Sequence, residues 1–154
     1  MNYDHIGQMI TIKIAEYGDQ TALRYKQNDK WESLSYKAFG EKIKNLTGAL
    51  IKAGVKKDDS VGIYSANRYE WAVSDFACIL AGAVSVPIYA TNTLEQAKYI
   101  IKDAGIKLIF VGNADQYSNV AAIQESGVPL QVISYESSIT IDKSFANYMN
   151  DFMD

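Results

Sequence analysis

The chain has 154 residues, which is enough for one domain with a substantial buried core. Hydrophobic residues at 48% and charged residues at 21% are typical of a soluble globular protein. The net charge of −3 argues against a nucleic-acid partner, because neutralising phosphates requires a concentrated basic face. We therefore expect no nucleic acid among its partners.

The single cysteine, Cys78, excludes an internal disulfide and fits a reducing compartment. The first residues lack the basic start and apolar run of a signal peptide. Residues 71–90 are apolar enough to suggest a membrane span, but Asp75, Gly82 and Pro87 favour a buried helix followed by a buried strand. We expect a cytoplasmic protein whose membrane contact is at most peripheral, since no basic amphipathic helix is present.

The first third of the chain predicts a helix and a hairpin. Residues 4–17 place apolar side chains at helical spacing and end at Gly18. Two segments, 21–26 and 31–35, flank the polar turn 27–30 and predict a β-hairpin.

A second helix is expected directly after the hairpin. Ser35 is suited to cap it, and Gly54 to end it. Its apolar face is formed by Phe39, Ile43, Leu46 and Leu50.

From residue 61 onward, short apolar runs alternate with helix-length gaps. The runs start about 23 residues apart and are 61–65, 84–89, 107–111 and 130–134. Three pairs of residues in the gaps have the spacing of helix caps: Asn67 with Glu70, Thr93 with Gln96, and Asn113 with Gln116. The sequence therefore predicts an α/β fold with a mainly parallel, doubly wound sheet, helices on both faces, and an N-terminal helix and β-hairpin in front.

Two further segments have weaker or unusual patterns. Residues 69–81 are apolar nearly all round, which predicts a helix buried on several sides. Beyond Ile139 we expect a short helix capped by Asp142 or Ser144, with Phe145, Tyr148 and Met149 on one side.

We expect residues 1–154 to form a single unit with three parts. These are a helix, hairpin and helix (1–56), repeated βα units (57–135) and a tail that continues into further sequence (136–154).

The residues offer little chemistry of their own. Cys78 lies in the apolar helix and the only histidine, His5, in the first, so a Cys–His nucleophile is disfavoured. One Cys and one His cannot form a structural zinc site, and neither glycine-rich phosphate motif occurs. Asp58 and Asp59 form a turn before a strand. We expect no catalytic residue and no metal ligand.

Ligands of open α/β sheets bind beyond the carboxyl ends of the strands. The polar residues expected there lead to four candidates for substrate binding: Asn67, Tyr89, Thr91 and Asn92. Helix capping competes with a binding role for Asn67, whereas a Tyr at a strand end often bridges core and solvent. Ser65, Arg68 and Thr93 are expected at the same edge.

Roughly residues 20–125 resemble the N-terminal region of adenylate-forming enzymes. The most specific elements are Asn67–Arg68–Tyr69–Glu70–Trp71 and the run from Gly82 to Thr91. The form Pro87–Ile88–Tyr89–Ala90–Thr91 is similar to the long-chain acyl-CoA synthetases. Relatives that activate acetate tend to carry an Arg that helps to hold CoA where this chain has Leu80, which weighs against the acetate branch.

The resemblance implies a two-step reaction. A fatty carboxylate attacks the α-phosphate of ATP, with Mg²⁺ offsetting phosphate charge, and gives an acyl-adenylate and pyrophosphate. The CoA thiol then displaces AMP. The family's phosphate loop, nucleotide contacts and catalytic lysine lie beyond Asp154, so we expect the front piece of a larger adenylate-forming domain that binds no cofactor tightly by itself. Its partners would be the C-terminal remainder of the same protein, fatty acid and CoA.

Two alternatives remain open. The chain is either an inactive structural portion of a ligase or a self-standing flavodoxin-like binding module, in which Asp58 and Asp59 or the strand ends hold a ligand. Faces left apolar by a missing remainder would also favour self-association, so a homo-oligomer is a further expectation.

Overall fold

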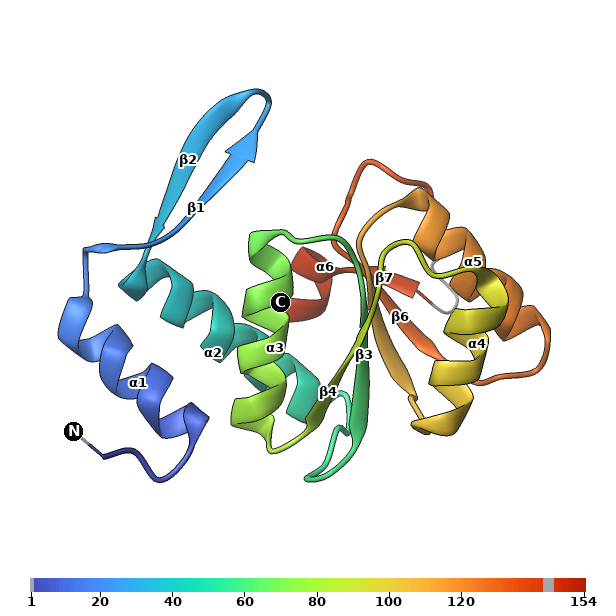
Figure 1. The fold of residues 1–154 in the computed structure, drawn as a ribbon, viewed down its shortest axis with the longest axis horizontal. Coiled ribbons are helices and arrows are strands. Elements are labelled where there is room, and N and C mark those ends of the chain that lie inside the picture. The colour runs from blue at the N-terminus through green and yellow to red at the C-terminus, as the bar shows by residue number, and fades with distance from the viewer. Residues whose placement is uncertain (1, 143–145) are drawn as a thin grey trace.

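The computed structural model describes residues 2–142 and 146–154 of the chain. An N-terminal arm of helix, hairpin and helix leads into a sheet with helices on both faces (Figure 1). The described elements are α1 (Ile6–Tyr17), β1 (Thr21–Gln27), β2 (Lys30–Ser35), α2 (Tyr36–Lys52), β3 (Ser60–Tyr64), α3 (Tyr69–Ala81), β4 (Val84–Ile88), α4 (Leu94–Asp103), β5 (Leu108–Val111), α5 (Ala114–Glu125), β6 (Gln131–Ser134), β7 (Ala146–Tyr148) and α6 (Met149–Met153).

The arm has the predicted helix and hairpin. The helix begins at Ile6 rather than at residue 4, because Nδ1 of His5 accepts a hydrogen bond from the backbone N–H of Gln8 and caps it. Asn28 and Asp29 both have positive φ, 49° and 61°, which is the backbone of a two-residue hairpin turn. The hairpin is a two-stranded sheet of its own and projects from the body (Figure 1).

The predicted helices α2 and α3 are confirmed. Ser35 Oγ accepts a hydrogen bond from the Ala38 N–H at 3.2 Å and caps α2. The predicted apolar face of α2 is fully buried, and so are Val73, Ala77 and Cys78 of α3. Within the described residues, no helix combines the length and the apolarity needed to cross a membrane.

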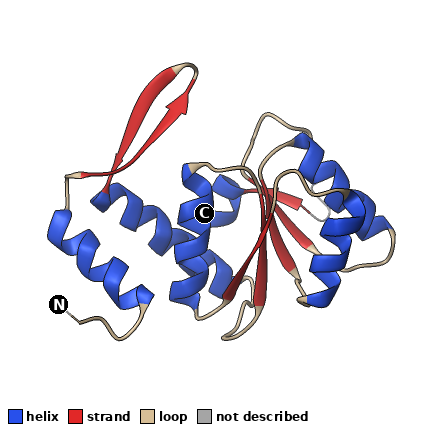
Figure 2. Cartoon of the chain, in the orientation of Figure 1, coloured by secondary structure: helices blue, strands red, loops and turns tan. Residues whose placement is uncertain are grey.

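The main sheet has five parallel strands in the order β4-β3-β5-β6-β7. Successive side chains of β3 point to opposite faces: Ile63 packs beneath α2 and α3, whereas Tyr64 packs in the cluster that includes α4 and α5. Helices cover both faces in Figure 2. The predicted doubly wound parallel sheet is therefore confirmed.

Part of the prediction for the last segment was wrong: a short helix that contains Met149 is present, but it begins later than expected. Tyr148 belongs to a strand, β7, whose three residues pair in parallel with Val132–Ser134. The helix is only the single turn α6, which begins at Met149 and is not capped by Asp142. Three residues are too few to show strand periodicity. The predicted roles of Ser144 and Phe145 lie outside the described residues.

Two of the three predicted caps are confirmed. Thr93 forms a complete capping box with Gln96, and Asn113 Oδ1 accepts a hydrogen bond from the Gln116 N–H at 3.0 Å. The predicted Asn67 cap is wrong. Helix α3 starts one residue later, after Arg68, and no side chain caps it.

Candidate functional site

The strand order creates a crevice at the carboxyl edge of the sheet. From β3 the chain moves through α3 to the outer strand β4, then returns through α4 to β5 on the other side of β3. The connections that leave β3 and β5 thus diverge to opposite faces, and ligands of open α/β sheets bind at such a point.

A cavity of about 720 Å³ opens at this point. One wall is the hairpin, through residues 23–27 and Trp31, and the other is the strand-end loop 65–70. Ala72, Gly112, Asn113, Gln116 and Glu136 complete the lining. We call this space the edge cleft.

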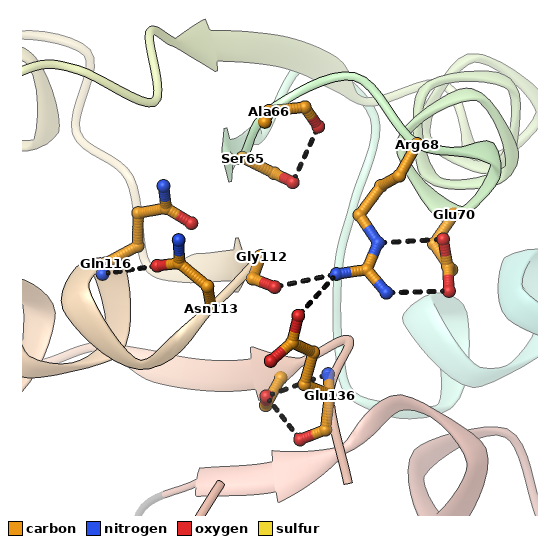
Figure 3. A network of polar contacts seen from close by, with 9 residues as sticks. Ser65, Ala66, Arg68, Glu70, Gly112, Asn113, Gln116 and Glu136 are labelled. Atoms are coloured by element: carbon orange, nitrogen blue, oxygen red, sulfur yellow. Dashed lines mark hydrogen bonds and ion pairs between the residues drawn. The ribbon is translucent and has the colours of Figure 1, made fainter. Parts of the chain in front are cut away.

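Arg68 forms hydrogen bonds and ion pairs that join the strand-end residues of the edge cleft (Figure 3). Its guanidinium donates to both carboxylate oxygens of Glu70 at 2.8 and 3.0 Å, and Nη1 donates to the Gly112 carbonyl at 2.7 Å. The same Nη1 lies 3.3 Å from Oε1 of Glu136, and the guanidinium lies over the Tyr135 ring. One side chain therefore ties together residues that follow β3, β5 and β6.

The charge of Arg68 is balanced within this network. Burial of the guanidinium opposes its charge, but the hydrogen bonds and charges of Glu70 and Glu136 outweigh burial and raise the pKa of Arg68. Two carboxylates face one guanidinium, so Arg68 is engaged in the protein rather than available to a phosphate.

Gln116 lies at the back of the edge cleft. Its side chain is 4% exposed, and Nε2 donates to the Ala90 carbonyl at 3.3 Å. Its Oε1 is buried without a hydrogen-bond partner among the described residues. A Cβ placed on Gly112 would overlap Ser65 and come within 2.9 Å of this oxygen, so only glycine allows this close packing.

The structure separates the four substrate-binding candidates. Asn67 is exposed and lines the edge cleft. The other three, Tyr89, Thr91 and Asn92, lie on the loop from β4 to α4, outside the cleft lining. Tyr89 is 81% exposed, whereas the Asn92 carbonyl accepts a hydrogen bond from the buried Tyr64 hydroxyl.

Sequence reasoning missed the hairpin wall, together with Gln116 and Glu136. The sequence marks Gln116 only as part of a helix cap. No local pattern marks the facing hairpin residues, because they reach the site from an element distant in sequence. The strand-end rule applied to the fourth run, 130–134, would have pointed to Glu136.

The described residues provide no acid–base pair for nucleophilic catalysis. Burial, and secondarily the charge of Asp75, raises the pKa of the Cys78 thiol to about 12, so it stays protonated. His5 caps α1. Asp58 and Asp59 lie before β3, at the edge opposite the cleft, where Asp59 Oδ2 accepts from the Lys56 N–H.

The residues present do not fit Mg²⁺-ATP. Among residues 2–142 and 146–154, no group of three His, Cys, Asp or Glu side chains is arranged to hold a metal ion. The sequence contains neither of the glycine-rich motifs that cradle phosphates. We assign no chemical step to these residues.

Comparison with curated proteins gives consistent relatives. The chain is 32% identical over 151 residues to a long-chain-fatty-acid–CoA ligase of Homo sapiens, which covers 97% of the chain and 22% of the relative. It is 32% identical over 135 residues to a ligase of the same description from Xenopus laevis, and the match covers 87% of the chain and 18% of the relative. A mycobacterial long-chain-fatty-acid–CoA ligase, from Mycobacterium bovis, is 30% identical over 127 residues, covering 82% and 21%. The chain thus spans about a fifth of the length of these relatives.

Solved structures share the fold. An anthranilate CoA ligase in complex with anthranoyl-AMP superposes with a TM-score of 0.84 at 18% identity, covering 98% of this chain and 28% of that one. A coronafacic acid ligase from Pectobacterium brasiliense gives 0.84 at 18% identity, covering 96% and 29%. The model of the family described as AMP-binding enzyme matches residues 11–148. The chain therefore belongs to the AMP-binding enzyme family.

Proposed function

We propose that the chain is the N-terminal portion of an ATP-dependent, AMP-forming long-chain fatty acid–CoA ligase, which converts fatty acid, ATP and CoA into acyl-CoA, AMP and pyrophosphate. The supporting observation is the 32% identity to a human long-chain-fatty-acid–CoA ligase along 97% of the chain. The run Pro87–Ile88–Tyr89–Ala90–Thr91, which resembles the long-chain branch, supports the same assignment.

By itself the chain is inactive under this proposal. Its strand ends lack a phosphate motif, and its described residues lack both a metal-ligand cluster and an activated nucleophile. The complete ligase would use ATP, Mg²⁺ and CoA, with ATP and Mg²⁺ held by residues of the remainder. The chain would supply a rigid layer that supports them, in a cytoplasmic enzyme that contacts membranes at most peripherally.

The exposed loop from β4 to α4 is the part of the chain that we assign to substrate contact, through Tyr89, Thr91 and Asn92. Tyr89 presents a large ring to solvent, and hydrogen bonds from Tyr64 and Gln116 to loop carbonyls fix the backbone beneath it. Asn67, in the edge cleft, is a separate candidate.

Replacing Tyr89 tests this assignment in the complete ligase. Tyr89→Ala should raise KM for CoA or fatty acid several-fold with little change in stability, because the ring is exposed. Tyr99→Ala is the matched control, since Tyr99 is 68% exposed on α4. Equal KM values for both variants would remove Tyr89 from the substrate site.

The function itself is tested with the product of the complete source reading frame. We expect acyl-CoA formation that depends on a long-chain fatty acid, ATP and CoA, and none from the 154-residue chain under the same conditions. A complete product that releases no AMP with any fatty acid would contradict the proposal.

A second candidate is a self-standing binding module. The strand order β4-β3-β5-β6-β7 is that of flavodoxin-like proteins, with a cavity of about 720 Å³ at the point where the connections diverge. A source reading frame that stops at Asp154 would favour this candidate. A frame that continues into a Ser/Thr/Gly-rich loop ending in Pro–Lys–Gly would favour the ligase.

A further inference from the structure

We propose that Tyr64 is a positioning residue for the ligase reaction: its buried hydroxyl, held by Asn119, fixes the exposed turn of residues 89–92 in the shape that meets substrate. This role rests on the proposed function, which assigns the turn to substrate contact. It adds the side chains beneath the turn that give its backbone one conformation.

The connection from β4 to α4 consists of residues 89–93, and its backbone is held almost throughout. The Asn92 N–H donates to the Tyr89 carbonyl at 2.9 Å, which closes a four-residue turn. Thr93 then caps α4 in a capping box with Gln96. The connection is therefore a closed turn that leads directly into a capped helix.

Two side chains from other elements hold this turn from below. The Tyr64 hydroxyl, at the end of β3, donates to the Asn92 carbonyl. Nε2 of Gln116, on α5, donates to the Ala90 carbonyl at 3.3 Å. The Tyr64 oxygen in turn accepts a hydrogen bond from Nδ2 of Asn119 at 3.0 Å. Because this oxygen accepts from an amide, its own proton is directed to the turn.

The tether connects the core to a surface whose side chains do not pack. The Tyr64 ring is completely buried, in the cluster that includes residues of α4 and α5. On the turn itself, Tyr89 is 81% exposed and Thr91 is exposed as well. Surface connections without packed side chains are ordinarily mobile. Here hydrogen bonds from the core take the place of packing, so the backbone is fixed while the exposed side chains stay available.

A fixed backbone beneath exposed side chains is suited to binding, because less freedom is lost when a ligand is bound. Loss of the Tyr64 hydroxyl should release the turn without touching the reacting atoms. It should therefore weaken the binding of the substrate that meets Tyr89, and raise KM while kcat stays unchanged.

The test measures steady-state kinetics of the complete ligase with CoA and with palmitate, each varied while the other substrates are saturating. Tyr64→Phe removes the hydroxyl and keeps the ring. We expect the KM for one of the two substrates to rise about 2- to 10-fold, the range of one lost hydrogen bond, with kcat unchanged. Tyr148→Phe is the matched control, since it removes a Tyr hydroxyl that donates to another connection, at the Ile139 carbonyl and 2.7 Å. Its KM values should equal those of the wild type.

A double-mutant cycle shows whether Tyr64 acts through the turn. Tyr64→Phe should add little to the KM of Tyr89→Ala, because a turn without its ring has already lost the contact that the tether positions. Fully additive changes in KM would overturn the inference.

Hydrogen exchange of residues 89–93, read by mass spectrometry on the complete protein, reports the tether independently of activity. Tyr64→Phe should speed exchange of the Asn92 amide, which closes the turn, several-fold, and Tyr148→Phe should not. Asn119→Asp is the second variant, for use if Tyr64→Phe does not fold. Its carboxylate only accepts hydrogen bonds and competes with the Asn92 carbonyl for the Tyr64 proton, so it should speed the same exchange and raise the same KM.

Unchanged exchange in the turn would overturn the inference, and so would faster exchange with unchanged KM values in an active ligase. Either result leaves the proposed function standing. A complete protein that forms no acyl-CoA would contradict the proposed function. In that protein faster exchange would still support the tether, and unchanged exchange would overturn it.

Discussion

Arg68 joins three strand ends through one guanidinium. The bidentate pair with Glu70 fixes its plane, and the remaining N–H groups reach Gly112 and Glu136. Its side chain is 26% exposed and that of Glu70 12%, so water offers these groups little compensation. The network gives one wall of the edge cleft a fixed shape.

Arg68→Gln should therefore lower the free energy of unfolding by about 1–3 kcal/mol, because it leaves a half-buried carboxylate and a carbonyl without their donor. Urea unfolding measures the change. Arg24→Gln is the control: Arg24 lines the same cleft but is exposed, and its replacement should change stability by less than about 0.5 kcal/mol. Equal losses in the two variants would show that the network contributes nothing specific.

Cys78 is expected to lower the free energy of unfolding as the pH becomes alkaline. Burial, then Asp75, raises the pKa of its thiol from 9.0 to about 12 in the folded chain. Between those values the unfolded chain releases the thiol proton while the folded chain retains it. The stabilisation of the folded state by the protonated thiol is therefore complete below pH 9 and is lost as pH rises toward 12. The free energy of unfolding should thus fall more steeply over this range in the wild type than in Cys78→Ala. Parallel curves would contradict a buried, protonated thiol.

At the scale of elements, the caps show what local sequence determines. Thr93 and Gln96 satisfy each other's backbone donors in a complete capping box. The same pattern at Asn67 and Glu70 fails, because Arg68 engages the Glu70 carboxylate through both oxygens. An ion pair between residues two apart in sequence thus overrides the capping pattern.

This difference predicts unequal effects of two alanine substitutions. Thr93→Ala should destabilise the chain by about 1 kcal/mol, the usual contribution of a cap, whereas Asn67→Ala should stay within about 0.5 kcal/mol. Thermal unfolding at matched pH compares them. A larger loss for Asn67→Ala would mean that its side chain caps α3 after all.

The elements with strong periodicity could be predicted, and the site only in part. Parallel strands such as β3 and β5 are buried on both faces, so their apolar runs identify them. β7 was not predicted, because its three residues form a strand through pairing with β6 and have no sequence pattern of their own. The edge cleft was not predicted for a related reason. Its hairpin wall and the strand ends are far apart in sequence and come together only when the chain folds.

At the scale of the molecule, large apolar side chains remain on the surface. They include Ile6, Trp31 and Ile51 on the arm, and Val84, Tyr89 and Tyr99 on β4, the loop after it and α4. A ligase that continues beyond this portion would cover some of them. In the isolated chain they remain in contact with water.

The 154-residue chain should accordingly self-associate as its concentration rises, and it should bind a hydrophobic dye. Multi-angle light scattering and dye fluorescence measure the two effects. Trp31→Ser should reduce both more than Tyr99→Ser does, since Trp31 adjoins the aromatic residues of the edge cleft. A clean monomer at high concentration without dye binding would contradict this expectation.

Calorimetric titration of the purified chain with Mg²⁺-ATP, CoA and a long-chain fatty acid, each alone, tests the central claim most directly. A ligase portion whose phosphate-binding residues lie in the remainder should give no saturable heat with ATP. Saturable binding of CoA or fatty acid alone would locate part of that substrate site on this chain, and Tyr89→Ala would then test the loop after β4. Tight ATP binding would contradict the account, because it would show a nucleotide site complete within these 154 residues.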